Sequence, residues 1–443
     1  MEFVLTSGAK KIISTLEDNG FSAYVVGGAV RDFLMDKPPH DFDIATSALP
    51  SQIQGLFRRT IDTGIKHGTV TVVEGGVGYE VTTYRTDGEY VDGRHPKNVS
   101  FIASIEEDLK RRDFTVNAMA YNPTSGVLDI CGGREDIQNR LIRCVGVPEK
   151  RFSEDALRMM RAIRFSATLG FELEAETERA IKKCAPMIRR VSPERIRDEI
   201  NKILMSDRPE YIAKLHICGL LKYIIPELET CAGVKQKNKY HIYDVFEHII
   251  VTVKNTPSDL TLRWAALLHD IGKPGCSSCD SNGIIHFYGH HRESVRMAND
   301  ILHRLRLDND TIHDILILIE NHDVRIDTSP PGVKRMMSKT GKLFEKLLLL
   351  QEADNLAKNL KFFKEKKKKL DEAREVYKLV LAEHQPYMIS ELTVNGRDLI
   401  KLGYKPGRSL GDCLKKLLDE VIIDPNLNRR EYLLSRAREF KRN

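Results

Sequence analysis

The hydrophobic periodicity of this chain changes once, near Phe152, and that change limits the folds open to it. Before that point, helical patterns alternate with short runs rich in β-branched residues, at 24–26, 42–45, 69–73, 79–83 and 127–130. Beyond it, apolar residues recur at spacings of three and four with almost no strand pattern, over 155–169, 174–184 and 194–204. We therefore predict an α+β fold, with a small mixed sheet first and helices over the rest of the chain.

The length and composition indicate a folded protein of several packed units. A chain of 443 residues favours two to four such units, and 41% hydrophobic with 30% charged residues does not fit a disordered chain. No apolar run approaches the roughly 20 residues that span a bilayer, and the amino terminus lacks the continuous apolar core of a secretory signal. We expect a cytoplasmic location and no membrane partner, and the sequence sets no oligomeric state.

Two loop-like breaks, near residues 236–239 and at Pro386, divide the helical part of the chain. Together with the change of periodicity they predict four domains. These are a mixed-sheet head, a helical neck, a histidine-bearing helical domain and a carboxy-terminal tail, at residues 1–140, 141–235, 236–385 and 386–443.

The cysteines and the net charge constrain the function only weakly. Eight scattered cysteines in a chain without a secretory signal argue against a disulfide framework. Cys276 and Cys279 have the spacing of zinc ligands, but no second pair follows, so we interpret them as two incidental thiols in a surface loop. The net charge of +6 permits a polyanionic partner without requiring one.

A glycine pair, Gly27 and Gly28, stands between a strand-like run and a helical start. Glycines at such a turn let backbone amides approach a phosphate at the helix amino terminus. By itself the pattern is more typical of an ordinary turn than of a phosphate site.

Two aspartates two residues apart strengthen the phosphate interpretation. On a strand, Asp41 and Asp43 would point to the same face while Phe42 points to the other. Carboxylates gathered in this way bind Mg²⁺ together with nucleotide phosphates, and Glu80 is the best candidate for a third acid. The alternative is a pair of solvated aspartates at a strand end.

These residues open a series of motifs that resembles the class II tRNA nucleotidyltransferases, the family of the CCA-adding enzymes and bacterial poly(A) polymerases. The resemblance implies a nucleotidyltransferase head that transfers nucleotides by two-metal catalysis with Mg²⁺, and tRNA, CTP and ATP as partners. In chain order the matching segments are Gly27–Asp32 (GGAVRD), Asp41–Asp43 (DFD), Arg111–Ala118 (RRDFTVNA), Asp129 with Gly132–Asp136 (GGRED), Glu154–Arg158 (EDALR) and Pro193–Glu199 (PERIRDE).

The resemblance also assigns roles to single residues of the head and neck. The catalytic carboxylates would be Asp41, Asp43 and Glu80, with Asp41 and Asp43 as metal ligands. Asp155 and Arg158 would act as a protein template that hydrogen-bonds the base edge of the incoming CTP or ATP. The other expected nucleotide-binding residues are Gly27, Gly28, Arg31, Arg112, Asp113, Asn117, Arg161 and Arg164.

The template role agrees with the spacing of its two residues. On one helix Asp155 and Arg158 would be neighbours, able to present acceptors and a fork of donors to one base. Alone, such a pair is usually a solvated salt bridge. For Arg161 and Arg164, tRNA backbone binding or structural pairing are rivals to a triphosphate contact.

A polar, glycine-containing segment, residues 87–96 (DGEYVDGRHP), resembles the family's flexible loop. In that family the loop is linked to the switch from C to A addition. Its full length here disfavours an enzyme that adds only C.

A second set of possible ligands lies in the helical middle of the chain. The order of these residues along the chain resembles that of the metal ligands in the HD superfamily of metal-dependent phosphohydrolases. The resemblance implies the ligands His248, His269, Asp270, His290, His322 and Asp354. An adjacent histidine and aspartate at an apolar helix end are costly to bury without a metal or a partner. The resemblance implies a divalent metal such as Ni²⁺, Mn²⁺ or Mg²⁺ and an accessory phosphodiesterase or phosphatase activity.

Two features mark the carboxy-terminal part. The lysine-rich run Lys364–Lys369 is interpreted as a solvated helix face. Residues 395–411 resemble the family's tRNA-binding segment, whose basic residues would contact the RNA backbone.

The leading hypothesis is therefore a CCA-adding enzyme with an accessory HD phosphohydrolase activity. One rival is an A-adding enzyme or poly(A) polymerase. Another is chiefly an HD phosphohydrolase whose head only binds RNA, and the three acids of the head argue against it.

Overall fold

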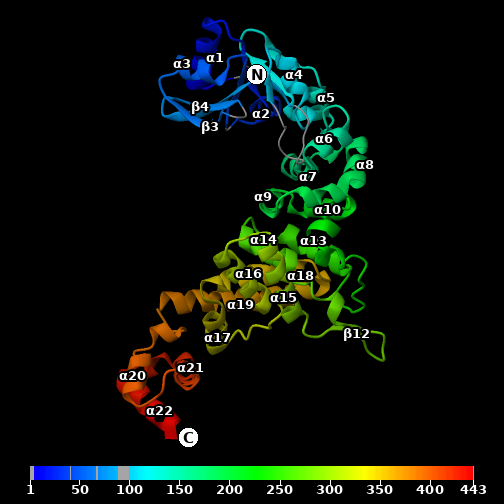
Figure 1. Cartoon of the computed structure of the whole chain (residues 1–443). Coiled ribbons are helices and arrows are strands. Elements are labelled where there is room, and N and C mark those ends of the chain that lie inside the picture. The colour runs from blue at the N-terminus through cyan, green and yellow to red at the C-terminus, as the bar shows by residue number, and fades with distance from the viewer. Residues whose placement is uncertain (1–3, 40, 66–67, 88–98, 443) are drawn as a thin grey trace. The chain divides into compact units, whose positions relative to one another are not determined.

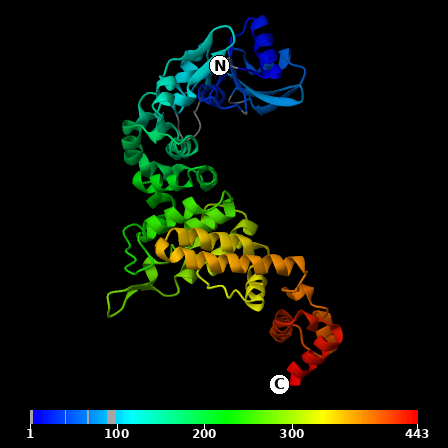
Figure 2. The ribbon, with the colours of Figure 1, turned by 180° about the vertical axis from the view of Figure 1, so that it is seen from behind.

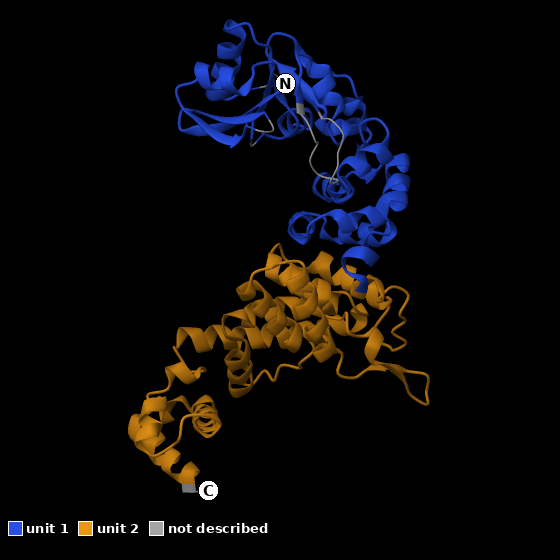
Figure 3. Ribbon diagram, in the orientation of Figure 1, with its two compact units in different colours: residues 1–226 blue, residues 227–443 orange. Residues whose placement is uncertain are grey.

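The computed structural model describes residues 4–39, 41–65, 68–87 and 99–442 (Figure 1). It divides into two compact units, residues 1–226 and 227–443 (Figure 3). Over the described ranges, no helix is both long and apolar enough to cross a membrane. The predicted α+β class is confirmed, because the main sheet belongs to the first unit and the described part of the second is helical apart from one short hairpin.

The first unit begins with a seven-stranded mixed sheet in the order β3-β4-β5-β2-β1-β8-β9. Its strands are β1 (Ala23–Val26), β2 (Asp43–Thr46), β3 (Thr60–Gly64), β4 (Thr69–Glu74), β5 (Val77–Thr83), β8 (Met119–Asn122) and β9 (Gly126–Asp129). All five predicted runs overlap strands of this sheet, whereas β3 and β8 were not predicted. Over its described ranges the structure also contains three two-stranded sheets. In the first unit, β6 (Arg85–Asp87) pairs with β7 (Val99–Phe101), and β10 (Leu141–Ile142) pairs with β11 (Glu172–Leu173). The third is the hairpin of the second unit.

The central strands β1 and β2 are buried on both faces. Because side chains alternate along a strand, Val25 of β1 and Ile44 of β2 face one core while Val26 and Ala45 face another. Helices α1 (Ser7–Asp18), α2 (Gly28–Leu34) and α3 (Pro50–Leu56) supply the first core, and α4 (Ile105–Lys110) supplies the second. This double coverage fixes β1 and β2, while β5 is held by its pairing with β2 and by Tyr79 and Val81 in the first core.

The rest of the first unit is helical, as predicted. Its helices are α5 (Gly133–Gln138), α6 (Pro148–Glu154), α7 (Leu157–Leu169), α8 (Ala175–Cys184), α9 (Pro193–Leu204), α10 (Lys214–Ile217) and α11 (Leu221–Ile224), with α12 (Pro226–Glu229) at the border of the two units. One expectation is wrong, because Asp155 is not on the helix that carries Arg158. Its backbone is extended (φ −143°, ψ 106°) between α6 and α7, and its Oδ1 accepts a hydrogen bond from the Leu157 N–H at 3.0 Å. This bond satisfies an amide at the start of α7.

The second unit is built from long helices and two short strands. They are α13 (Val245–Asn255), α14 (Leu260–Leu268), β12 (Ser277–Cys279), β13 (Ile285–Phe287), α15 (His290–Arg304), α16 (Asn309–Asn321), α17 (Pro330–Thr340), α18 (Phe344–Leu356), α19 (Phe363–Ala382), α20 (Gly396–Lys401), α21 (Arg408–Ile423) and α22 (Arg430–Arg442). Figure 2 shows α19 as the long orange helix of this unit. The last three helices share a core of their own that includes Leu399, Leu417 and Leu433.

The border between the units differs from the predicted end of the neck. Residues 227–235 were expected in the neck, but they belong to the second unit. Hydrogen bonds hold this segment to the start of α13, from the Val245 N–H to Val234 O (3.0 Å) and from the Gly233 N–H to Asp244 Oδ2 (2.8 Å). The division into four domains stays a prediction.

Candidate functional site

A polar cavity of 610 Å³ lies in the first unit, where the sheet faces the helices α7 and α9. Most of the predicted head and neck residues line it: Gly27, Gly28, Arg31, Asp43, Glu80, Arg112, Asp113, Asn117, Asp155, Arg158 and Arg161. The predicted residues Asp41 and Arg164 are not among the lining residues. The cavity thus joins two parts of the chain that sequence reasoning connected only through the order of motifs.

Two carboxylates are placed side by side by the pairing of parallel strands. Ile44 of β2 is the partner of Val81 of β5, so Asp43 and Glu80, one position earlier, are neighbours. The pKa of Asp43 is raised above its ordinary value, first by burial of the carboxylate and then by the charges of Glu80 and Asp41, while Arg112 opposes the shift. Asp41 lies before the start of β2, so only Asp43 takes its orientation from the strand. Oxygen donors of this kind fit a hard divalent cation.

The first glycine of the pair, Gly27, is required because the chain there passes close to an arginine. Gly27 has φ 72° and ψ −127°, and a Cβ atom on it would lie 3.2 Å from Arg112 Nη1. Such a backbone conformation is rarely adopted by residues other than glycine. The pair therefore brings the start of α2 against the cationic wall of the cavity.

Ion pairs and hydrogen bonds fix that wall between α2 and α7. Arg31 Nη1 donates to Asn117 Oδ1 at 2.6 Å, and Arg161 Nη2 lies 2.6 Å from Asp113 Oδ2. Burial alone would raise the pKa of Asp113, but the Arg161 guanidinium holds it below its ordinary value. Among the residues that the structure describes, seven arginines line the cavity, namely Arg31, Arg85, Arg111, Arg112, Arg158, Arg161 and Arg195. Over the same described ranges they outnumber the four lining acids, which suits a polyphosphate anion.

The predicted template residues both reach the cavity, and their side chains are held by different partners. Asp155 Oδ2 lies 2.8 Å from Arg195 Nη2, and Arg158 Nη1 lies 2.5 Å from Glu154 Oε2. The reason is the break between α6 and α7, which takes Asp155 out of the helical register of Arg158. Arg195, on α9, lies in the matching segment Pro193–Glu199, but the sequence did not lead us to predict it as a site residue. Its place in that motif was the only indication in the sequence that it belongs to the site.

Arg164, which was predicted to bind the nucleotide, instead pairs with an acid of the neighbouring helix. Its Nε donates to Glu199 Oε2 at 2.6 Å, and its guanidinium lies 3.7 Å from the centre of the Phe165 ring. These contacts join α7 to α9 and favour the structural pairing that was considered as its rival role. The segment expected to be a flexible loop, residues 87–96, lies outside the described residues except for Asp87.

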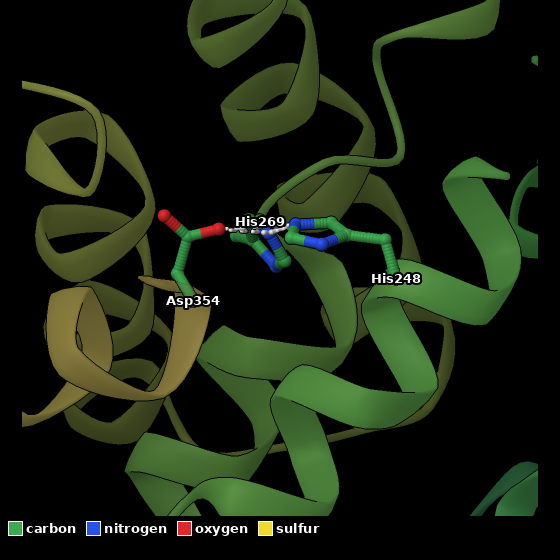
Figure 4. Close-up of side chains that lie close together, drawn as sticks. All are labelled: His248, His269 and Asp354. Atoms are coloured by element: carbon green, nitrogen blue, oxygen red, sulfur yellow. Dashed lines mark hydrogen bonds and ion pairs between the residues drawn. The ribbon is translucent and has the colours of Figure 1, made fainter. Parts of the chain in front are cut away.

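In the second unit, the six residues of the second predicted set come together in one buried cluster. His248 Nε2 lies 3.0 Å from Asp354 Oδ1, and His269 Nε2 lies 3.3 Å from His248 Nε2 (Figure 4). Asp270 lies within 3.6 Å of His290 Nε2 and His322 Nε2. These six residues come from α13, α15 and α18 and from the residues that follow α14 and α16.

The four histidine rings are oriented by the backbone. Each Nδ1 lies within hydrogen-bond distance of a main-chain carbonyl, at 3.1 Å for His248, 2.8 Å for His269, 2.8 Å for His290 and 2.7 Å for His322. A proton held at Nδ1 leaves the lone pair of Nε2 directed at the cluster, which is the arrangement of metal-binding histidines.

The cluster also contains buried oxygens that lack a hydrogen-bond donor. Asp270 Oδ1 and Asp354 Oδ1 are both buried without such a partner, whereas the other oxygen of each carboxylate faces a lysine. Lys273 Nζ lies 2.6 Å from Asp270 Oδ2, and Lys358 Nζ lies 2.5 Å from Asp354 Oδ2. Burial alone would raise the pKa of Asp354, but Lys358 holds it well below its ordinary value. Ionised oxygens together with imidazole nitrogens fit a divalent metal. The two lysines were not predicted as site residues.

The lysine-rich run Lys364–Lys369, predicted to be a solvated helix face, is not exposed along its whole length. Lys366, within the run Lys364–Lys369, is half-buried and donates to Asn355 Oδ1 at 2.9 Å. The solvated-face interpretation is therefore wrong for this lysine, because α19 turns it toward α18. The thiols of Cys276 and Cys279 stay free in and beside the β12–β13 hairpin.

Family models match three parts of the chain. A model described as "Poly A polymerase head domain" matches residues 23–143, and one described as "Probable RNA and SrmB- binding site of polymerase A" matches residues 170–231. A third, described as "HD domain", matches residues 240–359 and covers all six residues of the second cluster.

Relatives and solved structures match nearly the whole chain. A CCA-adding enzyme from Leuconostoc mesenteroides is 34% identical over 98% of this chain and 96% of its own, and one from Lactobacillus helveticus is 36% identical over 94% and 92%. The crystal structure of the Bacillus stearothermophilus CCA-adding enzyme in complex with CTP is 33% identical, with a TM-score of 0.74, over 98% of this chain and 97% of that one. Continuous similarity of this extent shows that the chain belongs to the CCA-adding enzyme family of tRNA nucleotidyltransferases.

Proposed function

We propose that this protein adds CMP and AMP, taken from CTP and ATP, to the 3′ end of tRNA. The observation that carries the proposal is the 610 Å³ cavity, in which acids from the sheet and a hydrogen-bonding pair from the neck line one space. Its relatives are named CCA-adding enzymes, and solved relatives are described in complex with CTP, with ATP or with tRNA. Structures at 21% or 22% identity, such as the Thermotoga maritima enzyme with tRNA, support the fold alone.

The lining residues divide the work of the transfer reaction. Asp43 and Glu80, with Asp41 beside them, would hold Mg²⁺, which lowers the pKa of the attacking hydroxyl and neutralises phosphate charge. The arginine wall would hold the triphosphate. The 3′ hydroxyl oxygen bonds to the α phosphorus, the bond from that phosphorus to the β-bridging oxygen breaks, pyrophosphate leaves, and the hydroxyl proton passes to solvent.

Base selection would fall to the neck. Asp155 offers carboxylate oxygens that accept a hydrogen bond from the exocyclic amine of cytosine or adenine, and Arg158 offers donors to a ring nitrogen or carbonyl. Both bases present an amine at this edge, whereas uracil presents a carbonyl in its place, which leaves the Asp155 oxygens unpaired. Arg195 would keep Asp155 in position from the opposite side.

The decisive experiment supplies purified protein with tRNA that ends before CCA, after CC, or after the complete CCA. CTP and ATP are given singly and together, and products are sequenced. We expect C, C and A in order and no extension of complete tRNA. Incorporation of A without C would overturn the proposal in favour of an A-adding enzyme, and long A tails would indicate a poly(A) polymerase.

For the second unit, we propose a metal-dependent phosphohydrolase activity. Four preset histidine nitrogens and two orphaned carboxylate oxygens support it, and Ni²⁺, Mn²⁺ or Mg²⁺ would fit these donors. When bound, the metal would activate water. The water oxygen bonds to phosphorus, the ester P–O bond breaks, and the leaving oxygen takes a proton. Hydrolysis of phosphate esters by the Asp270→Ala variant at the wild-type rate would refute this activity.

The tail, within the proposed fourth domain at 386–443, would bind the tRNA backbone. Lys401, Lys405 and Arg408 are exposed along α20 and the start of α21. Contacts of this kind release counterions, so tRNA affinity should fall with salt, and less steeply after Lys405→Ala. A salt slope that does not change in this variant would remove Lys405 from the interface.

A further inference from the structure

The polar cavity of the first unit is lined by an aromatic ring that has no role in the reactions described above. Among the residues that the structure describes, Phe165 of α7 is the only aromatic residue that lines this cavity. Phe165 is 8% exposed, and its ring stands nearly perpendicular to that of the buried Phe114, with ring centres 5.7 Å apart and an angle of 75°. The ring is therefore held in one orientation where it meets the cavity.

Three guanidinium groups lie over this single ring. Those of Arg31 and Arg161 lie 5.6 Å and 5.4 Å from the ring centre, and that of Arg164 lies 3.7 Å from it. The face of an aromatic ring carries partial negative charge and attracts a cation within about 6 Å of its centre. Phe165 thus attracts one cation from α2 and two from its own helix.

The ring is a contact that two arginines of the cavity share. Arg31 and Arg161 both line the cavity, and each pairs with an acid: Arg31 Nη2 lies 2.7 Å from Asp32 Oδ1, and Arg161 Nη2 lies 2.6 Å from Asp113 Oδ2. An acid fixes a guanidinium but cancels part of the charge that a phosphate would use. A neutral ring orients both cations and leaves their charge available to an anion.

Stacking of a nucleobase is the other role that an aromatic ring in this cavity could have. One face of the Phe165 ring is already covered by the Arg164 guanidinium, at a separation similar to that of a stacked base. Arg164 is fixed there, because its Nε donates to Glu199 Oε2 at 2.6 Å. Rings that stack bases present a face to the ligand. The surroundings of Phe165 therefore favour a role toward phosphate over a role toward the base.

We propose that Phe165 is a positioning residue that holds Arg31 and Arg161 for the polyphosphate of the incoming nucleotide. The ring fixes the direction of both guanidiniums before the nucleotide binds, so less side-chain freedom is lost when the polyphosphate arrives. The effect of Phe165 on the nucleotide passes through these two arginines. The inference rests on the nucleotide transfer proposed above and adds to it a residue that organises the arginine wall.

The first test weakens the negative face of the ring and keeps its shape. Phe165 is replaced by trifluorophenylalanine in the full-length protein, because fluorine withdraws electron density from the ring face. Equilibrium dialysis with Mg²⁺ then measures Kd for CTP, CDP and CMP without turnover. We expect Kd for CTP to rise by about threefold to tenfold, Kd for CDP to rise less, and Kd for CMP to stay unchanged. An unchanged Kd for CTP would overturn the proposal, and so would an equal rise for CMP, which would assign the ring to the base or the ribose.

The second test uses natural side chains and measures incorporation of single nucleotides. Phe165→Leu keeps an apolar side chain but removes the ring, and Phe165→Tyr restores a ring. We expect KM for CTP to rise about tenfold in Phe165→Leu with kcat nearly unchanged, because the arginines hold the polyphosphate equally before and during the reaction. Phe165→Tyr should return KM toward the wild-type value.

A second buried phenylalanine offers the matched control for Phe165→Leu. Phe171 is 2% exposed, and the Arg140 guanidinium lies 5.5 Å from its ring centre. Neither residue is among those that line the cavity. Phe171→Leu therefore removes a ring and its cation contact from the same unit and should leave KM for CTP unchanged. An equal rise in both variants would show that the loss reflects packing of the unit, which would overturn the proposal.

A double-mutant cycle tests whether the ring acts through an arginine. Phe165→Leu should raise Kd for CTP by a smaller factor in an Arg161→Ala background than in wild type, because the cation that the ring positions is already gone. Factors that multiply independently would contradict the proposed route of action.

The outcomes distinguish this inference from the function on which it rests. If wild type incorporates no nucleotide but the fluorinated ring weakens CTP and not CMP, nucleotide transfer fails and the positioning role of Phe165 stands. If wild type adds C and A and the fluorinated protein binds CTP as tightly as wild type, nucleotide transfer stands and the role of Phe165 is wrong.

Discussion

Asp155 and Arg195, 40 residues apart in the sequence, form the ion pair that fixes the predicted template carboxylate beside the nucleotide cavity. The pair connects the segment between α6 and α7, which contains Asp155, to the first turn of α9, which contains Arg195. Both side chains line the cavity. Arg158 is held from its own side by Glu154. The two template residues are therefore positioned by separate partners, so each can be tested alone.

The first prediction concerns Arg195. Its replacement by alanine removes a charge-assisted hydrogen bond of about 1.5–3 kcal/mol, so Asp155 loses its fixed position. We expect kcat/KM for CTP and for ATP to fall by about 10- to 100-fold. Initial rates of single-nucleotide incorporation measure this, with Lys202→Ala on the exposed face of α9 as the matched control. Equal rates in the two variants would show that Arg195 does not position Asp155.

The second prediction concerns the conformation of Gly27. An alanine there meets both an unfavourable φ of 72° and the Arg112 guanidinium, at 3.2 Å. We expect a stability loss of about 1–3 kcal/mol and a fall in nucleotide affinity, because Arg112 must move. Gly55→Ala, inside α3 with open space around it, should be neutral or slightly stabilising. Thermal unfolding and equilibrium binding of CTP measure the two effects. Similar behaviour of both variants would argue against a special role for Gly27.

The third prediction is a pH dependence of stability that arises from Asp113. The pKa of this carboxyl is lowered in the folded chain, so its contribution to stability is complete above its ordinary value of 3.8. The contribution is lost as the pH falls through the lower folded pKa. Asp113→Asn should therefore destabilise the first unit by about 2 kcal/mol at pH 7 and by less in strong acid.

The single tryptophan provides the control for that measurement. Trp264 is buried in α14, so its fluorescence reports on the second unit, while circular dichroism reports on helices of both units. The Asp113→Asn shift should appear in circular dichroism and leave the fluorescence transition in place. A shift in both signals would mean that the two units unfold together.

The fourth prediction concerns the metal cluster. In an Asp41→Ala, Asp43→Ala background that silences the first unit, Asp270→Ala should weaken Mn²⁺ or Ni²⁺ binding by at least about 100-fold. Removal of Asp270 eliminates a carboxylate that lies within 3.6 Å of the Nε2 atoms of all four histidines of the cluster. Equilibrium dialysis measures the affinity, and His303→Ala, an exposed histidine on α15, is the matched control. Unchanged affinity in Asp270→Ala would contradict the assignment of this cluster as a metal site.

The sequence by itself determined the family and the fold class. Motif order was sufficient for the family because the motifs are local, and the six residues of the second cluster, from His248 to Asp354, were predicted as candidate ligands by residue type. The β-branched runs predicted five of the seven strands because β-branched side chains pack well on a pleated surface that is at least partly buried. The less apolar β3, whose middle residues are exposed, lacked this signal.

Only the tertiary structure decided which side chains meet. The neighbouring positions of Asp43 and Glu80 follow from parallel pairing of β2 with β5, and the Asp155–Arg195 pair follows from where α6 ends. Lys366 lies in a cavity, not on a solvated face, because α19 packs against α18. Periodicity describes one element at a time, whereas these contacts depend on strand register, helix ends and packing between segments distant in the sequence.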